Sequence, residues 1–236
     1  MSNLGMLHVI AKGLDYLLPE VVFVGGAVAE LYASDAAASE VRPTNDVDCV
    51  IELFSYSKFA ELENQLRNLK FVNDTESNVI CRWDYAGIKV DIMPNDESIL
   101  GFSNIWYKEG MSHTLLYSFD DGIQIRYFET AYFLASKFVA LINRGGSDLR
   151  SSSDFEDIIY ILDNRLNLIS ELKDSGTGVI ASLNSFCKKL LQNGALEEVV
   201  ACALPLNSEY GRVMQVIDII KIISELNTMT GNKNIE

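Results

Sequence analysis

The segment 44–53, TNDVDCVIEL, places two aspartates one residue apart at the start of an apolar run. Alternate residues of a β-strand point to the same side, so Asp46 and Asp48 are predicted to share one face of a strand over 46–53. Two carboxylates this close repel each other and raise each other's pKa unless a cation lies between them. We therefore ask which cation offsets this charge. An acidic turn or a solvent-facing strand edge is the alternative explanation of the pair.

The composition is that of an acidic globular protein. The 236 residues include 33 acidic and 19 basic side chains, a formal net charge of -14, and 48% hydrophobic residues. That hydrophobic content excludes a disordered chain. The negative charge repels phosphate backbones at long range, so nucleic acid would need a local basic patch or a bound metal.

The cysteines and the apolar segments predict a cytoplasmic protein. The four cysteines lack the CxxC spacing of a structural zinc site and are expected to be reduced. Lys12 and Asp15 interrupt the N-terminal apolar stretch and no small-residue cleavage site follows, so we expect no signal peptide. No uncharged run approaches the length of about 18 residues that a membrane-spanning helix needs. We expect no membrane interaction.

Up to residue 128 the apolar spacing predicts both strands and helices. The expected elements are a helix over 7–18 ended by Pro19, a strand over 21–24, a helix over 27–33, a loop over 34–43, a strand over 46–53 and a helix over 58–69 capped by Ser57. Two β-hairpins follow, with strands over 79–85 and 88–93 around Ala86-Gly87, and over 113–119 and 123–128 around Asp120–Gly122.

From Glu129 onwards the pattern becomes helical. Helices are expected over 130–144, 154–163, 178–191 and 212–226. The fold class is therefore predicted to be α+β, with an α/β core over 1–128 and a helical domain over 129–236.

Three further features have the residue types of a phosphate site. In VVFVGGAVAEL, residues 21–31, Gly25 and Gly26 join a strand to a helix, and such a turn lets the backbone approach a phosphate closely. A plain tight turn is the alternative. In IKVDIMP, residues 88–94, Asp91 is expected to point away from the core. Lys137 lies in a helix otherwise lined by large apolar residues, where a lysine either extends to water or offsets triphosphate charge.

A third carboxylate beside an aspartate pair has a chemical meaning of its own. Oxygen ligands suit Mg²⁺ and Mn²⁺, and a two-metal site clamps the attacking and leaving oxygens of a phosphoryl displacement. Asp91 could also accept the proton of the attacking hydroxyl. An isolated charge on the solvated face is the alternative for this residue.

The order of Gly-Gly, Asp-x-Asp and a later lone aspartate resembles the minimal nucleotidyltransferase fold of DNA polymerase β-like enzymes, antibiotic nucleotidyltransferases and the AbiEii/AbiGii toxin group. The toxin group is the most similar. FVGGAVAEL...RPTNDVDCVI is similar to its first signature, IKVDIMP to its second, and ETAYFLASKFVALINR...SSSDFEDIIYIL to its third and fourth. The resemblance covers roughly residues 20 to 165. It implies a mixed-sheet nucleotidyltransferase core followed by a C-terminal helical domain, whose Lys137 contributes to the site.

The resemblance also implies roles for individual residues. Asp46, Asp48 and Asp91 would be catalytic and would hold Mg²⁺ or Mn²⁺, and Asp91 would help to activate the nucleophile. Nucleotide-binding roles are implied for Gly25, Gly26, Lys137, Asp154 and Asp157.

Two features differ from the family's pattern. Nineteen residues separate Gly26 from Asp46, more than the family usually has, so 34–41 is interpreted as an inserted loop that covers the site or recognises an acceptor. Ser153 stands where the toxins commonly carry an arginine before the acidic residue. A solvated helix face is the alternative explanation of the acidic residues that follow it.

The function implied is metal-dependent transfer of a nucleoside monophosphate from an NTP to an acceptor hydroxyl on a tRNA end, a protein or a small molecule. The implied biological role is the toxin of a toxin–antitoxin or phage-defence system, beside an antitoxin partner. A non-catalytic nucleotide-binding regulatory module is the alternative, and the intact set of three aspartates argues against it. A glycosyltransferase would use Asp-x-Asp but would not account for the Gly-Gly turn or for Asp91.

Overall fold

The structure is a computed structural model that describes residues 1–53, 55–77, 79–144, 148–206 and 208–226. Its strands form one sheet in the order β3-β4-β5-β2-β1-β7-β6. They are β1 (Val21–Val24), β2 (Asp46–Ile51), β3 (Val72–Asn73), β4 (Arg82–Tyr85), β5 (Ile88–Pro94), β6 (Thr114–Ser118) and β7 (Gln124–Phe128). β2 pairs in parallel with β5 and β1 with β7, whereas the other neighbours are antiparallel. The sheet is mixed, and the predicted α+β class is confirmed.

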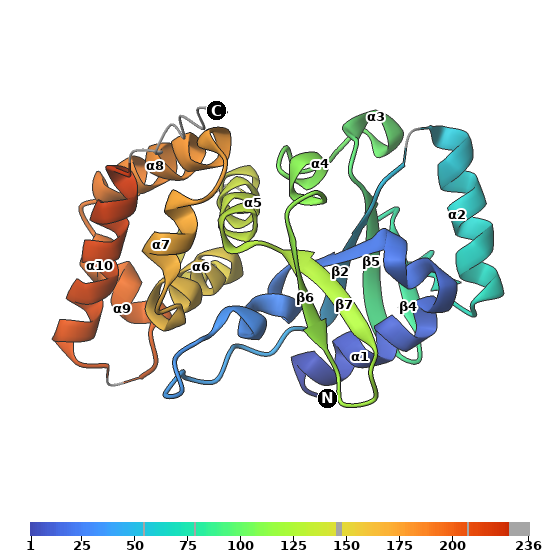
Figure 1. Ribbon diagram of the computed structural model, residues 1–236, viewed down its shortest axis with the longest axis horizontal. Helices are drawn as coiled ribbons and strands as arrows, with labels where there is room; N and C mark the ends of the chain where they lie inside the picture. The colour runs from blue at the N-terminus through green and yellow to red at the C-terminus, as the bar shows by residue number, and fades with distance from the viewer. Residues whose placement is uncertain (54, 78, 145–147, 207, 227–236) are drawn as a thin grey trace, which may run out of the picture.

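Helices flank the sheet and continue beyond it. They are α1 (Asn3–Leu14), α2 (Tyr56–Asn68), α3 (Glu97–Leu100), α4 (Tyr107–Gly110), α5 (Thr130–Asn143), α6 (Ser153–Asn164), α7 (Leu168–Lys173), α8 (Thr177–Leu191), α9 (Leu196–Ala203) and α10 (Tyr210–Ser224). Figure 1 shows α6 to α10 gathered on one side of the molecule, the sheet on the other, and α5 between them. The division into separate domains over 1–128 and 129–236 stays a prediction.

The two faces of the central strands differ in chemistry. Val47 on β2 is opposed to Val90 on β5, and both are fully buried. One residue further along, Asp48 is opposed to Asp91, and strand alternation turns this acidic pair to the other face. The core therefore lies against one face of β2 and β5, and the carboxylates lie on the opposite face.

The first two helices cover the apolar face. Gly13 of α1 lies against the ring of Tyr85, where a Cβ would come within 2.5 Å of a ring carbon. Phe71, just after α2, stacks on the same ring with centroids 4.4 Å apart. Arg67 of α2 lies over the ring of Trp83, 5.6 Å from its centroid. These contacts pack α1 and α2 against the apolar face of the sheet.

Several elements differ from the predicted ones. The first helix ends at Leu14, and Asp15–Glu20 forms a 3₁₀-helix that contains Pro19. Asp15 has a positive φ of 48°, which ends the α-helix before the proline is reached. The segment Gly26–Tyr32 is a 3₁₀-helix in place of the expected α-helix. The sequence pattern does not predict α3, α4, α7, α9 and β3, because they are too short to show a clear periodicity.

The cap of α2 was also assigned wrongly. The side chain of Ser55, not that of Ser57, accepts the hydrogen bond from the Lys58 amide at 3.3 Å. Ser57 lies inside the helix, which begins at Tyr56. Its hydroxyl is 2.9 Å from that of Ser55.

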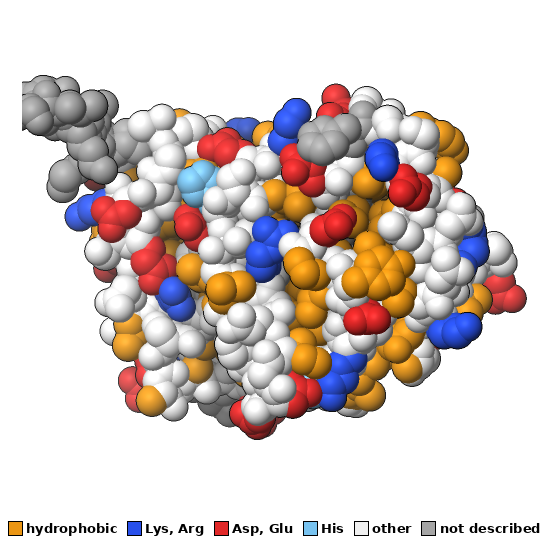
Figure 2. All heavy atoms as spheres, turned by 45° about the vertical axis from the view of Figure 1, so that its right-hand side comes forward, with side chains coloured by type: hydrophobic (Ala, Val, Ile, Leu, Met, Phe, Trp, Pro, Cys, Tyr) orange, Lys and Arg blue, Asp and Glu red, His pale blue; other side chains and the backbone are white. Residues whose placement is uncertain are grey.

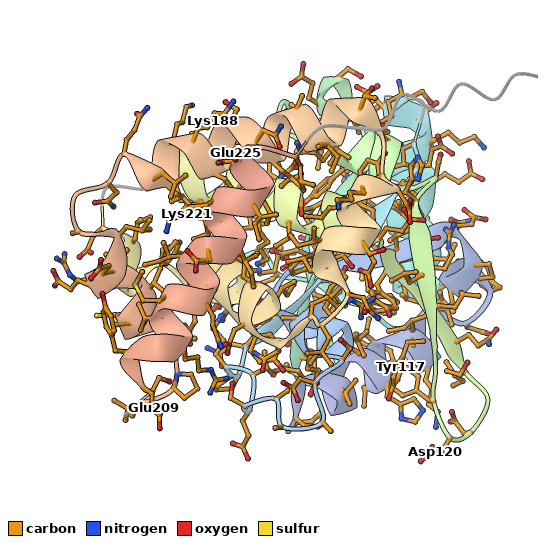
Figure 3. All side chains as sticks on the ribbon, turned by 60° about the vertical axis from the view of Figure 1, so that its left-hand side comes forward. Tyr117, Asp120, Lys188, Glu209, Lys221 and Glu225 are labelled. Carbon is orange, nitrogen blue, oxygen red and sulfur yellow. The ribbon has the colours of Figure 1, made fainter. Side chains whose placement is uncertain are left out.

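The surface carries charges of both signs. On the side that comes forward in Figure 2, acidic and basic side chains are interspersed, with hydrophobic side chains between them. In Figure 3 the β6–β7 hairpin extends with Asp120 at its tip, while Lys188 on α8 and Lys221 on α10 lie at the surface of the helical side. In the part of the chain that the structure describes, no helix is both long and apolar enough to cross a membrane.

The position of the α2 cap can be tested by two serine substitutions. Ser55→Ala is expected to lower the free energy of unfolding by about 1 kcal/mol, the usual value of an N-cap hydroxyl. Ser57→Ala is expected to cost less, because its hydroxyl caps no backbone amide of the helix. Urea denaturation of both variants measures the difference. A larger loss of unfolding free energy for Ser57→Ala would show that Ser57 is the N-cap, as expected from the sequence.

Candidate functional site

The three predicted carboxylates face one cavity. Asp46, Asp48 and Asp91 line a cavity of about 360 Å³ on the acidic face of β2 and β5. Gly26 also lines it. Four basic side chains complete its wall: Arg42, Arg82, Lys137 and Arg144. A cavity with carboxylates and several cations can bind an ion and an anion side by side.

The glycine turn is packed tightly against two charged groups. Gly25 follows Val24, which is paired with Asp48 across β1 and β2, and its φ is +73°. A Cβ at Gly25 would overlap the Asp48 carboxylate. A Cβ at Gly26 would lie 2.5 Å from the Arg42 guanidinium. The two glycines therefore make room for the charged side chains of the site.

Of the three carboxylates, Asp48 is the one that forms no ion pair with a described residue, whereas Asp46 and Asp91 both pair with Arg82. Burial raises its pKa, the charges of Asp46 and Asp91 raise it further, and Lys137 lowers it only in part, so that the pKa is about 7. Among the described residues, none donates a hydrogen bond to the Asp48 side chain. The repulsion expected from the sequence is therefore present, and it falls mainly on Asp48.

Arg82 forms ion pairs with the other two carboxylates. Its Nε and Nη2 donate to the two oxygens of Asp91 at 2.7 and 2.8 Å, and Nη2 also lies 3.3 Å from Asp46 Oδ2. The hydroxyl of Thr44 donates to the other oxygen of Asp46 at 2.9 Å. Arg82 is not among the site residues predicted from the sequence. Counting back from the Ala86-Gly87 turn would have placed it opposite Asp91, where the structure has it.

Lys137 lies in a buried network of charges. Its ammonium is 2.7 Å from Asp157 Oδ2 and 3.2 Å from Asp154 Oδ1. Arg42 donates two hydrogen bonds to Asp157 at 2.8 and 2.9 Å, and Arg144 donates one to Asp154 at 2.8 Å. Burial lowers the pKa of Lys137, but the two carboxylates outweigh burial and raise it above its ordinary value. Lys137 is therefore charged.

Asp154 and Asp157 occupy a different place from the other predicted site residues. They are 2% and 1% exposed, which excludes the solvated helix face considered above. Neither Asp154 nor Asp157 is among the described residues that line the cavity. They hold Lys137, Arg42 and Arg144, which do line it. Their contribution to ligand binding is therefore indirect, through the position of these cations.

The N-terminal helix and the inserted loop position the cavity wall. Asn3 is buried, donates to the carbonyl of Arg42 at 3.0 Å and accepts from the amide of Thr44 at 3.1 Å. The start of the loop is tied to the end of α6, since the amides of Ser34 and Asp35 donate to the Asn164 carbonyl. Because Arg42 and Thr44 both line the cavity, the segment that directly follows this loop is part of the site.

The donor set suits a hard cation held together with a phosphate. Asp46 and Asp48 offer carboxylate oxygens from one face of β2, and Mg²⁺ typically takes one or two carboxylates plus substrate phosphates. Within the described ranges, no three His, Cys, Asp or Glu side chains converge as a ready-made ion site. The unbonded carboxylate of Asp48 is the feature that fits the ion. Asp91 would join it only after release from Arg82.

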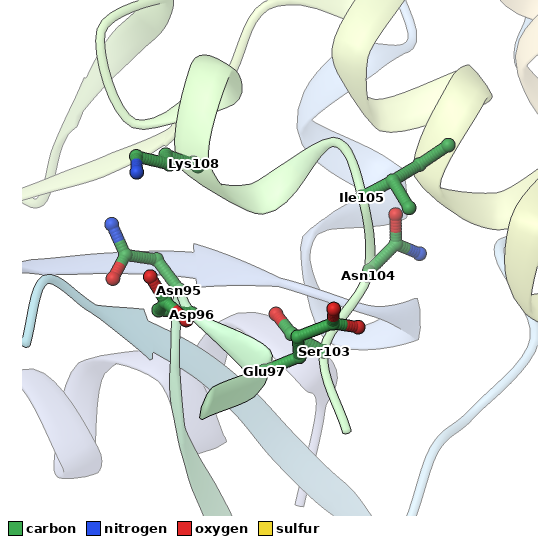
Figure 4. A pocket seen from close by; sticks show the side chains of 7 residues that line it. All are labelled: Asn95, Asp96, Glu97, Ser103, Asn104, Ile105 and Lys108. Atoms are coloured by element: carbon green, nitrogen blue, oxygen red, sulfur yellow. The ribbon is translucent and has the colours of Figure 1, made fainter. Parts of the chain in front are cut away.

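A second cavity lies away from these carboxylates. Its volume is about 310 Å³, and its wall includes Asn95, Asp96 and Lys108. Figure 4 shows Asn95 and Asp96 beneath Lys108, with Asn104 and Ile105 on the other side. None of the residues predicted for the site lines this cavity.

Comparisons with known proteins find matches among the solved structures. No protein-family model matches the chain, and no curated protein matches it. The solved structure of a protein described as a putative nucleotidyltransferase from H. pylori aligns with 94% of this chain and 93% of its own, at 12% identity and a TM-score of 0.44.

The energetic effect of the close contact between Gly25 and Asp48 can be measured separately from the effect of backbone strain. Gly122 also has a positive φ, +87°, but a Cβ there would meet nothing within 4 Å. Gly122→Ala is expected to lower the free energy of unfolding by about 1 kcal/mol, through strain alone. Gly25→Ala is expected to cost about 3 kcal/mol or more, because overlap is added to strain. Urea unfolding of the two variants measures this, and equal losses would contradict the contact.

The raised pKa of Asp48 predicts how stability changes with pH in metal-free buffer. Its pKa is about 7 in the folded protein and 3.8 ordinarily, so the folded state binds the proton more tightly. The free energy of unfolding therefore falls as pH rises from about 4 to 7. Over this range the unfolded state has already released the proton, and the folded state still binds it. Asp48→Asn removes this loss. Its melting temperature is expected to exceed that of the wild type by several degrees at pH 8 and by less at pH 5.

Asp218→Asn is the matched control for this measurement. Asp218 is exposed on α10 and pairs with Lys221. Its melting temperature relative to the wild type is expected to be the same at both pH values. A difference for Asp48→Asn that does not grow with pH would contradict the assigned repulsion.

Proposed function

We propose that the chain is a nucleotidyltransferase that moves a nucleoside monophosphate from an NTP to an acceptor hydroxyl. One observation carries this proposal: three carboxylates and four basic side chains face the same cavity of about 360 Å³. A divalent ion with a triphosphate needs both kinds of group. Carboxylates hold the ion, and cations offset the phosphate charge left over.

The basic side chains would bind the triphosphate. Asp154 and Asp157 hold Arg42 and Lys137, so the charges of these two are fixed before a ligand arrives. Arg144 also bonds to Asp154, but its side chain is 71% exposed. Fixed charges stabilise a phosphoryl-transfer transition state without the cost of reorganisation. Gly26 adds a stretch of backbone that has no side chain at the cavity wall.

The carboxylates would hold Mg²⁺ or Mn²⁺, with Asp46 and Asp48 as ligands and Asp91 as the third member of the set. When bound, the ion would polarise the phosphate and lower the pKa of the attacking hydroxyl. Thr44 fixes one oxygen of Asp46 and so leaves the orientation of that carboxylate defined.

The reaction would form a bond between the acceptor oxygen and the α-phosphorus and break the bond to pyrophosphate. The proton of the acceptor hydroxyl would pass to Asp91, once Asp91 is free of Arg82. The pyrophosphate carries away the electron pair of the broken bond. Its negative charge would remain beside Arg42, Lys137 and Arg144 until it leaves.

The acceptor is a hydroxyl on a tRNA end, a protein or a small molecule. The sequence resemblance to AbiEii/AbiGii toxins supports the further proposal that the chain is the toxin of a toxin–antitoxin or phage-defence pair, with an antitoxin as partner. The other candidate is a regulatory nucleotide-binding module without catalysis. The pairing of Asp91 with Arg82 favours that candidate, because both oxygens of Asp91 are bonded to the guanidinium instead of being free to face an acceptor hydroxyl.

Calorimetric titration of each NTP, with Mg²⁺ or with Mn²⁺, tests the proposal. The wild type is expected to bind at least one NTP only when the metal is present. Asp48→Ala is expected to weaken that affinity by about tenfold or more, since it removes a metal ligand. The nucleotide that binds is then supplied with an α-phosphate label to RNA, protein and small-molecule acceptors.

Asp218→Ala, on the far α10, serves as the control and is expected to bind as the wild type does. Failure of the wild type to bind any NTP with either metal would overturn the proposal. Binding without transfer of label to any acceptor would favour the regulatory module.

A further inference from the structure

Arg82 takes the place that a cation must have between Asp46 and Asp91. It bonds both oxygens of Asp91 at 2.7 and 2.8 Å and reaches Asp46 at 3.3 Å. These are two of the three carboxylates that the proposed function assigns to the metal. A divalent ion and the guanidinium therefore compete for the same oxygens.

We propose that Arg82 is a positioning residue that exchanges partners when the metal and the nucleotide bind. In the free protein it holds Asp91 and Asp46. In the complex it gives up Asp91 to the reaction and turns its guanidinium to the triphosphate. This inference rests on the proposed function and adds a residue that neither the sequence motifs nor the family resemblance assigns.

The chemistry of the side chain suits both partners. A guanidinium presents two parallel N–H groups that match a carboxylate or a phosphate equally well. Arg82 lines the cavity, and its side chain is 24% exposed, so it has room to move. Lys137 differs, because it is 8% exposed and held by two aspartates. Of these two cations, Arg82 is the one able to change partners.

The exchange makes metal binding depend on nucleotide. A metal ion alone would meet the positive charge of Arg82 and would have to displace it into a cavity already lined by other cations. A triphosphate offers the displaced guanidinium a new partner. Metal and nucleotide therefore strengthen each other's binding, and the coupling is reciprocal by linkage.

The test is Mn²⁺ binding to nucleotide-free protein, followed by electron paramagnetic resonance. Arg82→Gln is expected to bind Mn²⁺ at least tenfold more tightly than the wild type, because the competing charge is gone. Adding the NTP is expected to tighten Mn²⁺ binding strongly in the wild type and much less in Arg82→Gln. Mn²⁺ binding by Arg82→Gln that is no tighter than the wild type's would overturn the inference.

Three further variants make the result specific. Arg82→Lys keeps the charge and is expected to bind Mn²⁺ as weakly as the wild type, whereas a merely structural role for Arg82 predicts equal behaviour of Lys and Gln. Arg82→Gln with Asp48→Asn is expected to lose the gained affinity, which places the ion at the carboxylates. Arg67→Gln, on α2 beside Glu63, controls for loss of any arginine.

The outcome is distinct from that of the proposed function. The transferase proposal fails if the wild type binds no NTP with metal. The exchange proposed for Arg82 is contradicted if, without nucleotide, Arg82→Gln binds Mn²⁺ no more tightly than the wild type. That result does not depend on whether an NTP binds.

Discussion

The structure of this site depends on negative charge that the protein itself neutralises only in part. Asp46, Asp48 and Asp91 share the face of two paired strands, and Arg82 satisfies two of them. Asp48 keeps a charge that burial and its neighbours oppose, which raises its pKa to about 7. Such unrelieved repulsion persists in folded proteins where function needs it. Here it is consistent with a site that is completed by a cationic ligand.

The rest of the fold fixes this charge in place. The parallel pairing of β2 with β5 sets Asp48 beside Asp91, and helices α1 and α2 cover the opposite face. The helices after the sheet supply balancing positive charge. Lys137 of α5 carries this charge, and Asp154 and Asp157 of α6 hold the lysine in place. An aspartate pair buried without cations would cost several kcal/mol per ion. The network therefore has a structural role whatever ligand the cavity takes.

Much of the architecture could be predicted from the sequence, and the ion pairs could not. Period-two alternation predicted β2 and β5, placed Asp46 and Asp48 on one side of their strand and turned Asp91 away from the core. The register of a two-residue hairpin could also have given Arg82, because the turn fixes which residues face each other. Arg42 and Asp157 are 115 positions apart and meet only through the packing of a loop on α6. No local pattern encodes such a contact.

One contact at the N-terminus connects the first turn of the chain to the chemistry of the site. Asn3 holds the segment that carries Arg42 and Thr44 by two hydrogen bonds. Translation begun at Met6 would leave a chain with all its strands but without this clamp. An affinity tag fused ahead of Asn3 would lie next to the cavity wall. The choice of start codon and of tag position therefore decides whether a recombinant sample has an intact site.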